Sequence, residues 1–316
     1  MSEVGEVPIS IIPTGLPANR ELEPRASTHL IISTDISSGE YARGIKAAPL
    51  ERDDGLALLI VRNAARAQQL NPLLVMSSFA NVSGERAYQS LQRLERFWGE
   101  AKPPIVKGTI EAQHASTEAV ERAIDILKSS PVSVSLVALG AFTDVAEIVR
   151  MAKEQGLSDK ISEIILAAPS EDIEGNSQSF NTKADPEALK YLKQSEVTLV
   201  YGWDGTLQHA VSREIVQILE NSADPLDKYV AEGLEIRNAH LARASNLSKR
   251  IGRNLPGVLP EHEKRGGRMC IQDMIIPVYL ASPELFRKTK TQYGYKVEIA
   301  DHQGVDEKVQ ELVKSL

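Results

Sequence analysis

From residue 29 onward, short apolar runs alternate with longer segments whose apolar residues recur at helical spacing. The short runs are predicted strands, among them HLIIST, PLLVMSSF, SVSLVAL, SEIILAA and EVTLVYG. The segments between them are predicted helices, including DDGLALLIVRNAARAQQ, ERAYQSLQRLERFW, DVAEIVRMAKEQG and DPEALKYLKQS. Such alternation indicates a parallel sheet covered by helices, and continuously apolar strands suit burial on both faces. The expected fold class is α/β, with an open, mainly parallel, doubly wound sheet.

This alternation stops near Asn221. Residues 225–250 have a helical pattern, and residues 251–268 are rich in glycine, proline and charge. The chain then returns to apolar segments, MIIPVYLA and YKVEIA, and ends in the predicted helix DEKVQELVKSL. We predict an irregular N-terminal arm over residues 1–28 and a single domain over residues 29–316. Within that domain, residues 225–268 are interpreted as a helical lid or insertion over the carboxyl edge of the sheet, where open α/β sheets bind ligands.

Composition narrows the function classes. A net charge of −7 over 316 residues argues against general nucleic-acid binding. No apolar run approaches the ~20 residues that span a bilayer, so no membrane association is expected. The single cysteine, Cys270, excludes an intrachain disulfide and a thiolate zinc cage. One cysteine suits a reducing compartment, and the N-terminal residues lack the pattern of a secretory signal, so the predicted location is the cytoplasm.

Two adjacent carboxylates, Asp53 and Asp54, open the first predicted long helix. Helix capping is one explanation, because acidic side chains there accept hydrogen bonds from free backbone N–H groups and meet the positive end of the helix dipole. One aspartate would serve that purpose, and two neighbours point about 100° apart. One could therefore cap the helix or bind a hydroxyl while the other binds a hard cation. The pair alone does not decide between these interpretations.

Other polar residues stand at or near the ends of predicted strands. Asp35 follows the first strand, Asn81 the second and Thr143 the fourth, and Asp273 precedes a late apolar run. The carboxylates of Asp35, Asp54 and Asp273, with the Thr143 carbonyl, would form the all-oxygen set of ligands that Ca²⁺ favours. No histidine or thiolate cluster competes as a transition-metal site. The sequence therefore predicts a calcium site formed by these four residues.

The order of these motifs resembles that of the inosine-uridine nucleoside hydrolases. IISTD…DDGLALLI is similar to the acidic opening motif of that family, and FANVS to its Gly-Asn-Val-Ser turn. LVALGAFTDVA resembles its Leu-Gly-Pro-Leu-Thr-Asn segment, EGNSQSFNTKADPEAL its Gly-Asn … Phe-Asn … Ala-Asp-Pro-Glu-Ala segment, and QDM the site of its late calcium-binding aspartate. The resemblance covers most of residues 29–280. It implies a nucleoside hydrolase fold and calcium-dependent hydrolysis of the N-glycosidic bond of a ribonucleoside or related N-riboside, with release of base and ribose.

The resemblance also implies individual roles. Asp35 would be the general base as well as a calcium ligand, Asp54 the bidentate calcium ligand, and Asp53 would bind a ribose hydroxyl. Apart from the resemblance, the position of His114 in the loop after the third predicted strand could let it approach the base, although most lone histidines have no such role. The full set of expected substrate-binding residues is Asp53, Asn81, His114, Asn176, Ser179, Phe180, Asn181 and Gln272. The partner is then a small nucleoside-type molecule, and the family resemblance implies a homodimer or homotetramer.

The sequence departs from the family pattern in its acidic motif and near the expected leaving group. Residues 37–52 lie between Asp35 and Asp53, whereas the family's opening carboxylates are nearly contiguous. Ser33 occupies the position of the family's first aspartate, and Gln272 stands where relatives carry a histidine or tryptophan that serves the leaving base. These departures leave the leaving-group acid unassigned. They also keep an alternative function open, a catalytically weak nucleoside- or ribose-binding protein on the same fold.

One further departure concerns the 5′ end of the ribose. Ser179 replaces a glutamate that usually holds this end, and eight Lys or Arg side chains lie between Arg237 and Arg268. Together they suggest tolerance of a 5′ substituent such as a phosphate, which a glutamate would repel. The alternative is that Ser179 only loosens the site and that the basic residues form a solvated helical face.

Overall fold

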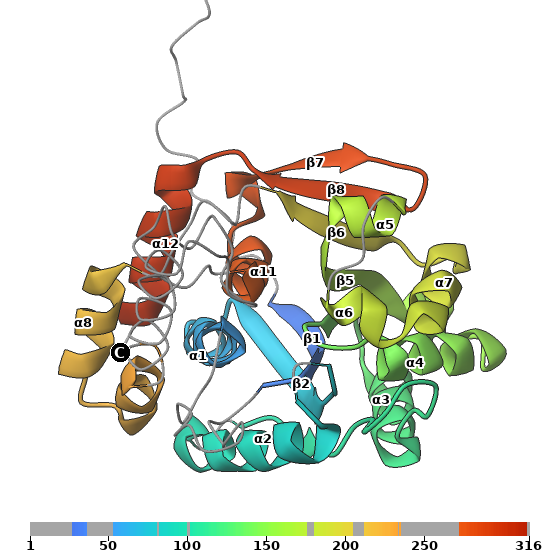
Figure 1. The fold of residues 1–316 in the computed structure, drawn as a ribbon, viewed down its shortest axis with the longest axis horizontal. Coiled ribbons are helices and arrows are strands. Elements are labelled where there is room, and N and C mark those ends of the chain that lie inside the picture. The colour runs from blue at the N-terminus through green and yellow to red at the C-terminus, as the bar shows by residue number, and fades with distance from the viewer. Residues whose placement is uncertain are drawn as a thin grey trace, which may run out of the picture.

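The computed structural model describes residues 27–36, 53–80, 82–99, 102–175, 180–204, 212–232, 234 and 272–314. Its centre is an eight-stranded sheet with the order β3-β2-β1-β4-β5-β6-β8-β7 (Figure 1). The strands are β1 (Thr28–Thr34), β2 (Leu70–Ser77), β3 (Ile105–Val106), β4 (Val134–Ala138), β5 (Ile161–Pro169), β6 (Leu199–Asp204), β7 (Phe286–Lys290) and β8 (Gly294–Ile299). The larger helices are α1 (Asp53–Arg66), α2 (Gly84–Trp98), α3 (Thr117–Ser129), α4 (Thr143–Glu154), α7 (Pro186–Gln194), α8 (Arg213–Asn221), α11 (Gln272–Ala281) and α12 (His302–Lys314).

All neighbouring strands pair in parallel except β7, which is antiparallel to β8. The chain starts at β1, moves outward through β2 and β3, then returns to the other side of β1 and continues through β4, β5 and β6. The strand order therefore reverses between β1 and β4, and a reversal of this kind opens a crevice at the carboxyl ends of the two strands. This arrangement confirms the predicted doubly wound α/β sheet.

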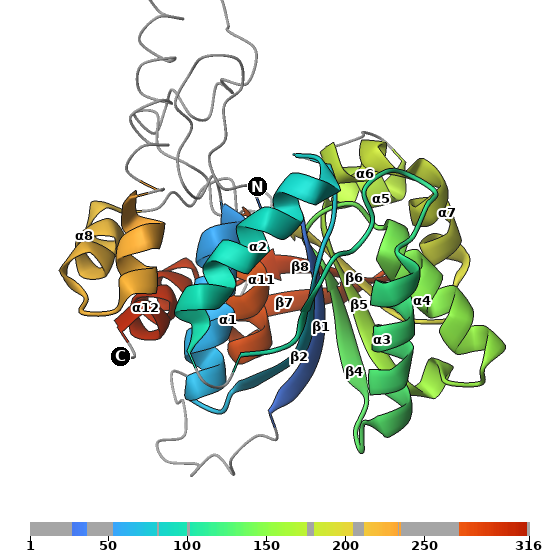
Figure 2. The same ribbon diagram turned by 90° about the horizontal axis from the view of Figure 1, so that it is seen from below.

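Helices cover both faces of the sheet, as Figure 2 shows. One buried cluster joins the sheet to α1, α2, α8, α11 and α12, and it includes Leu30 and Ile32 of β1. The second cluster joins the opposite face to α3, α4 and α7, and it includes Ile31 of β1. Successive residues of β1 thus enter different cores, which explains the continuous apolar run Leu30–Ile32. None of the described helices is long and apolar enough to cross a bilayer.

Local sequence signals set several helix boundaries. The Asp185 side chain accepts a hydrogen bond from the Ala188 N–H, and Pro186 is the first residue of α7, so the predicted cap is confirmed. Helix α4 ends at Glu154, and Gly156 follows with a φ of +69°. The segment MIIPVYLA forms most of α11, which contains Pro277. Residues 273–279 are all buried, so α11 shows no polar face that would have revealed a helical period in the sequence.

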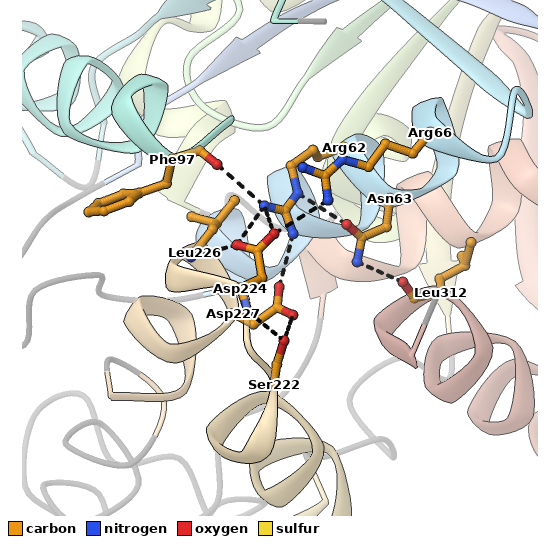
Figure 3. A network of polar contacts seen from close by, with 9 residues as sticks. All are labelled: Arg62, Asn63, Arg66, Phe97, Ser222, Asp224, Leu226, Asp227 and Leu312. Carbon is orange, nitrogen blue, oxygen red and sulfur yellow. Dashed lines mark hydrogen bonds and ion pairs between the residues drawn. The ribbon is translucent and has the colours of Figure 1, made fainter. Parts of the chain in front are cut away.

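A buried polar cluster ties α1 to the segment that follows α8 (Figure 3). The Arg62 guanidinium donates to Asp227 Oδ1 at 2.9 Å and to both carboxylate oxygens of Asp224, at 3.1 and 3.0 Å. The neighbouring Asn63 side chain donates to the Leu312 carbonyl of α12 at 2.8 Å. Residues 225–232 are helical, as predicted for the start of the lid segment. The remainder of the predicted lid and residues 1–26 of the predicted arm lie outside the described residues, so the domain division stays a prediction.

Candidate active site

Asp35 lies at the carboxyl end of β1, directly beside the turn that follows β4. Its side chain is buried, with 1% of its surface exposed. The Leu139 N–H donates to the Ser33 carbonyl at 2.8 Å, which holds this turn against β1. A Cβ atom on Gly140 would lie 3.0 Å from Asp35 Oδ1 and 2.9 Å from Asp35 Cβ. The turn therefore approaches Asp35 so closely that only glycine fits there without displacement.

Asp54 lies in the first turn of α1, and a side-chain hydrogen bond connects it to the end of β1. The Thr34 hydroxyl donates to Asp54 Oδ1, and both side chains are fully buried. Since Thr34 immediately precedes Asp35, two of the predicted calcium ligands lie at the same strand end. The Asp53 side chain, predicted to bind ribose, is outside the described side chains.

Asp273 is a buried residue in the first turn of α11, and α11 packs along α1. Within the described part of the chain, no group of three or more His, Cys, Asp and Glu side chains is arranged to hold a metal ion. The donor chemistry fits a hard cation, because the predicted ligands are buried carboxylates and a carbonyl. Convergence of Asp35, Asp54, Asp273 and Thr143 on one ion stays a prediction.

Thr143 begins α4, and its side chain has a structural partner. Its hydroxyl donates to Asp185 Oδ2 at 2.6 Å, and the same oxygen accepts the Gln113 N–H at 3.0 Å. Asp185 thereby links the first turn of α4 to the loop that carries His114. The His114 side chain itself is 73% exposed, and its Nδ1 lies 3.0 Å from the Ala112 carbonyl. The calcium role predicted for Thr143 belongs to its carbonyl, which this side-chain contact leaves unaffected.

Asn181 and Phe180 lie in the short helix α6 (Phe180–Ala184), near the ends of β4 and β5. The Asn181 side-chain nitrogen donates to the carbonyls of Leu139 and Ala167, at 2.7 and 3.2 Å. Leu139 precedes Gly140, so this contact places Asn181 beside the turn that packs on Asp35. Phe180 is 58% exposed, which is unusual for a large apolar side chain in this structure and leaves it accessible to a ligand.

Other predicted site residues cannot be placed in this way. Asn81, Asn176, Ser179, the Gln272 side chain and the basic stretch from Arg237 to Arg268 lie outside what the structure describes. Their assigned roles stay predictions.

Asp144, which was not singled out in the sequence, is a buried acid next to Thr143. Its two carboxylate oxygens accept the backbone N–H groups of Thr109, at 2.7 Å, and Ser116, at 2.8 Å. Burial raises the pKa of this carboxyl to about 6, and the two backbone hydrogen bonds oppose that rise only in part. The similar segment of the family has asparagine at the position of Asp144. This difference was the sequence signal that could have identified Asp144. Its role is to hold the 109–116 loop to α4.

A groove of about 560 Å³ lies over α4, between α3 and α7. Helix side chains line most of it, and it also includes His114, Thr143 and Asp185. Neither Asp35 nor Asn181 lines the groove, so we do not place the sugar site there. The candidate site is the carboxyl edge at β1, β4 and β5. There Thr34, next to Asp35 in the chain, hydrogen-bonds Asp54, and Asn181 hydrogen-bonds Leu139, next to the Gly140 turn that packs on Asp35.

A doubly wound sheet with buried acids where its strand order reverses defines the class of the fold as α/β. A family model described as inosine-uridine preferring nucleoside hydrolase matches residues 49–311. The chain belongs to this family.

Individual relatives agree with this assignment. Over 124 residues the chain is 34% identical to the pyrimidine-specific ribonucleoside hydrolase RihB of Escherichia coli O17:K52:H18 (strain UMN026 / ExPEC). That match covers 38% of this chain and only 39% of the length of the relative. The solved purine-preferring ribonucleoside hydrolase from Gardnerella vaginalis has a TM-score of 0.66 at 14% identity, covering 91% of this chain and 98% of that one. The type III effector protein XopQ, complexed with adenosine diphosphate ribose, has a TM-score of 0.64 at 14% identity, covering 92% and 94%. At such identities the two structures show a shared fold.

Proposed function

We propose that this protein hydrolyses the N-glycosidic bond of a ribonucleoside or related N-riboside, releasing base and ribose. The observation that supports this most is the position of Asp35, buried at the strand-order reversal of a nucleoside hydrolase family member, beside the Thr34–Asp54 hydrogen bond. A binding protein needs sugar-recognising groups, but it does not need a buried carboxylate that can accept a proton from water.

In the proposed reaction, the Asp35 carboxylate accepts a proton from the attacking water. Asn181 orients the ribose through its side-chain oxygen, because its nitrogen already donates to Leu139 and Ala167. Asp53 accepts a hydrogen bond from a ribose hydroxyl, and Asn81 and Asn176 complete the contacts to the sugar. Phe180, exposed at the start of α6, covers the bound substrate.

The proposed cofactor is Ca²⁺, held by Asp35, Asp54, Asp273 and the Thr143 carbonyl. These donors are the hard oxygen ligands that calcium prefers. When bound, the ion would lower the pKa of a water molecule, and Asp35 would accept the proton. The burial of Asp35 and Asp54 supports this proposal, since a cation would offset the cost of burying carboxylates.

The test is a panel of purine and pyrimidine ribonucleosides incubated with the protein and Ca²⁺, with free base and ribose both assayed. The panel includes both base classes because the named relatives differ, one being pyrimidine-specific and another purine-preferring. Asp35→Asn should lower kcat at least ~10²-fold while substrate still binds. Asp159→Asn, an exposed aspartate, is the matched control and should behave as wild type. If the wild-type protein bound nucleosides but released neither base nor ribose, the binding-protein alternative would replace the hydrolase proposal.

The accepted substituent at the ribose 5′ end is a separate proposal. A glutamate at position 179 would repel a 5′-phosphate by about 4 kcal/mol at ~4 Å and an effective dielectric near 20. Ser179 carries no charge and removes this repulsion. XopQ, complexed with adenosine diphosphate ribose, offers a precedent on this fold for a sugar with a phosphorylated 5′ end. The comparison is kcat/KM for a nucleoside and its 5′-monophosphate in wild type and Ser179→Glu. An equal preference for the nucleoside in both proteins would refute tolerance of the phosphate.

We also expect a homodimer or homotetramer located in the cytoplasm. Light scattering coupled to size-exclusion chromatography measures the oligomeric state, and cell fractionation measures the location.

A further inference from the structure

Thr34 and Asp54 lie 20 positions apart in the sequence but are joined by a buried hydrogen bond. The Thr34 hydroxyl donates to Asp54 Oδ1, and neither side chain has any exposed surface. The 37–52 segment lies between them. In the resembling family motif the carboxylates are nearly contiguous, so a short connection limits how the strand end and the helix start can be placed. Because the cost of bringing two chain ends together grows with the number of residues between them, a connection of this length restrains the two ends less than a short one would.

The donor side of this hydrogen bond is firmly held. Thr34 is the last residue of β1, and its backbone pairs with Ser77 of β2. Its carbonyl accepts the Ser78 N–H at 2.7 Å. On the opposite side, the carbonyl of Ser33 accepts the Leu139 N–H at 2.8 Å. Strands on both sides thus fix the backbone at Thr34, and a β-branched side chain has few χ1 rotamers in which to place its hydroxyl.

The direction of the hydroxyl follows from the alternation along β1. Leu30 and Ile32 contribute to the core that contains α1, and Ile31 contributes to the opposite core. Thr34 continues the first series, so it faces α1 at the level where Asp54 begins the helix. A hydroxyl donated to a carboxylate is a charge-assisted hydrogen bond, which is stronger than a neutral one. Fixing Oδ1 in this way also fixes the plane of the carboxylate and the direction of Oδ2.

We propose that Thr34 is a positioning residue that orients the Asp54 carboxylate for cation binding, replacing the restraint that a short connection would supply. The inference rests on the proposed function, because it requires Asp54 to be a calcium ligand. Groups around a metal that hydrogen-bond to its ligands typically change metal affinity 10–100-fold when they are removed.

The experiment measures Ca²⁺ binding to the full-length protein without substrate, by calorimetry and by the Ca²⁺-dependent rise in Tm. Thr34→Val removes the hydroxyl and keeps the branched shape, and it should weaken calcium affinity about 10–100-fold. Thr34→Ser keeps the hydroxyl and should restore affinity to within about 3-fold of wild type, a rescue that packing alone would not give. Thr291→Val is the matched control. Thr291 lies in the β7–β8 turn, and its hydroxyl contacts that of Tyr201 in β6. Removal of this hydroxyl should leave calcium affinity unchanged.

Separate outcomes distinguish this inference from the proposed calcium site. If wild type binds calcium, Asp54→Asn abolishes binding and Thr34→Val binds as wild type does, then the role of Thr34 is wrong while the site stands. If Thr34→Val and Thr34→Ser weaken binding equally, keeping the hydroxyl does not rescue calcium affinity, and the inference is again overturned. If wild type binds no calcium, both proposals fail. Should Thr34→Val not fold in EDTA, Thr34→Ala replaces it, with the same expected loss of affinity.

Discussion

The side-chain nitrogen of Asn181 lies 2.7 Å from the carbonyl oxygen of Leu139. A second carbonyl, that of Ala167, lies 3.2 Å from the same nitrogen. Because both neighbouring groups are hydrogen-bond acceptors, the amide nitrogen must face them. The side-chain oxygen of Asn181 then faces away from these two carbonyls. The sequence placed Asn181 among the sugar-binding residues, and this geometry indicates which of its atoms remains for that purpose.

Asn181→Asp should therefore be damaging although it is nearly isosteric. It replaces the donor with a carboxylate oxygen facing two carbonyls, and the loss of such buried hydrogen bonds costs about 1–3 kcal/mol of unfolding free energy. KM should rise as well, because the side chain turns away from its present orientation. Asn221→Asp is the control, since the Asn221 nitrogen donates to the Gln217 carbonyl on an exposed face of α8. Urea unfolding and steady-state kinetics measure both effects, and a variant matching wild type in both would contradict the assigned orientation.

Gly140→Ala should reduce turnover by displacing Asp35. The added Cβ would lie 3.0 Å from the Asp35 backbone nitrogen and from its Oδ1. Overpacking of this kind costs about 1–3 kcal/mol in stability, and displacement of a reacting group by ~1 Å can lower turnover on the order of 10²-fold.

Gly156→Ala is the matched glycine control. Its φ is +69° and nothing lies within 4 Å of the added Cβ, so only the backbone conformation is strained. It should lose roughly 1–2 kcal/mol of stability and keep its kcat. Equal kcat values for the two variants would show that Gly140 does not position Asp35.

Asp144 should make stability depend on pH. Its pKa rises from an ordinary value of 3.8 to about 6 in the folded protein, chiefly because the carboxyl is buried. Between these values the folded state binds more protons than the unfolded state, so stability falls as pH rises from about 4 to about 6. At 1.36 kcal/mol per pKa unit the contribution is about 3 kcal/mol.

Asp144→Asn removes this titration. Urea unfolding of wild type and variant from pH 4 to pH 7 should show that wild type loses about 3 kcal/mol more over that range. A difference between the two proteins that stays constant with pH would mean that Asp144 does not titrate there.

Arg62→Met should destabilise the protein by about 3–5 kcal/mol, because it leaves the carboxylates of Asp227 and Asp224 without their buried cation. The Arg62 and Asp227 side chains, whose contact Figure 3 shows, are each 1% exposed. Arg66→Met is the control: Arg66 also contacts Asp224, at 3.3 Å, but is 36% exposed. An exposed pair of this kind contributes less than about 1 kcal/mol. Similar losses of unfolding free energy for the two variants would contradict a special role for the buried cluster.

Periodicity predicted most of the fold because most elements have a recognisable pattern. Most of the parallel strands contain a continuous apolar run, and helices such as α7 carry their own caps, as Asp185 and Pro186 show. Helix α11 has no polar face and contains Pro277, so its sequence did not reveal its secondary structure. The antiparallel strand β7 was also missed. Four of its five residues are exposed, so it lacks the apolar run that identified the other strands.

The candidate site was predictable to the extent that its residues belong to recognisable motifs. Asp35, Asp54 and Asn181 were predicted in this way, and the structure places them at one edge of the sheet. Thr34 and Asp144 were not, because their importance comes from contacts with residues distant in sequence. A hydroxyl next to an aspartate carries no signal until the fold places another carboxylate against it.

The two borders of the sheet limit how copies of this protein can associate. At one border β3 pairs over two residues, Ile105 and Val106. At the other, β7 exposes Arg287, Lys288 and Lys290 along its length. Very short border strands and rows of cationic side chains both discourage strand addition from another chain. A homo-oligomer of this protein should therefore assemble through its helical faces and not by continuing the sheet from one subunit into the next.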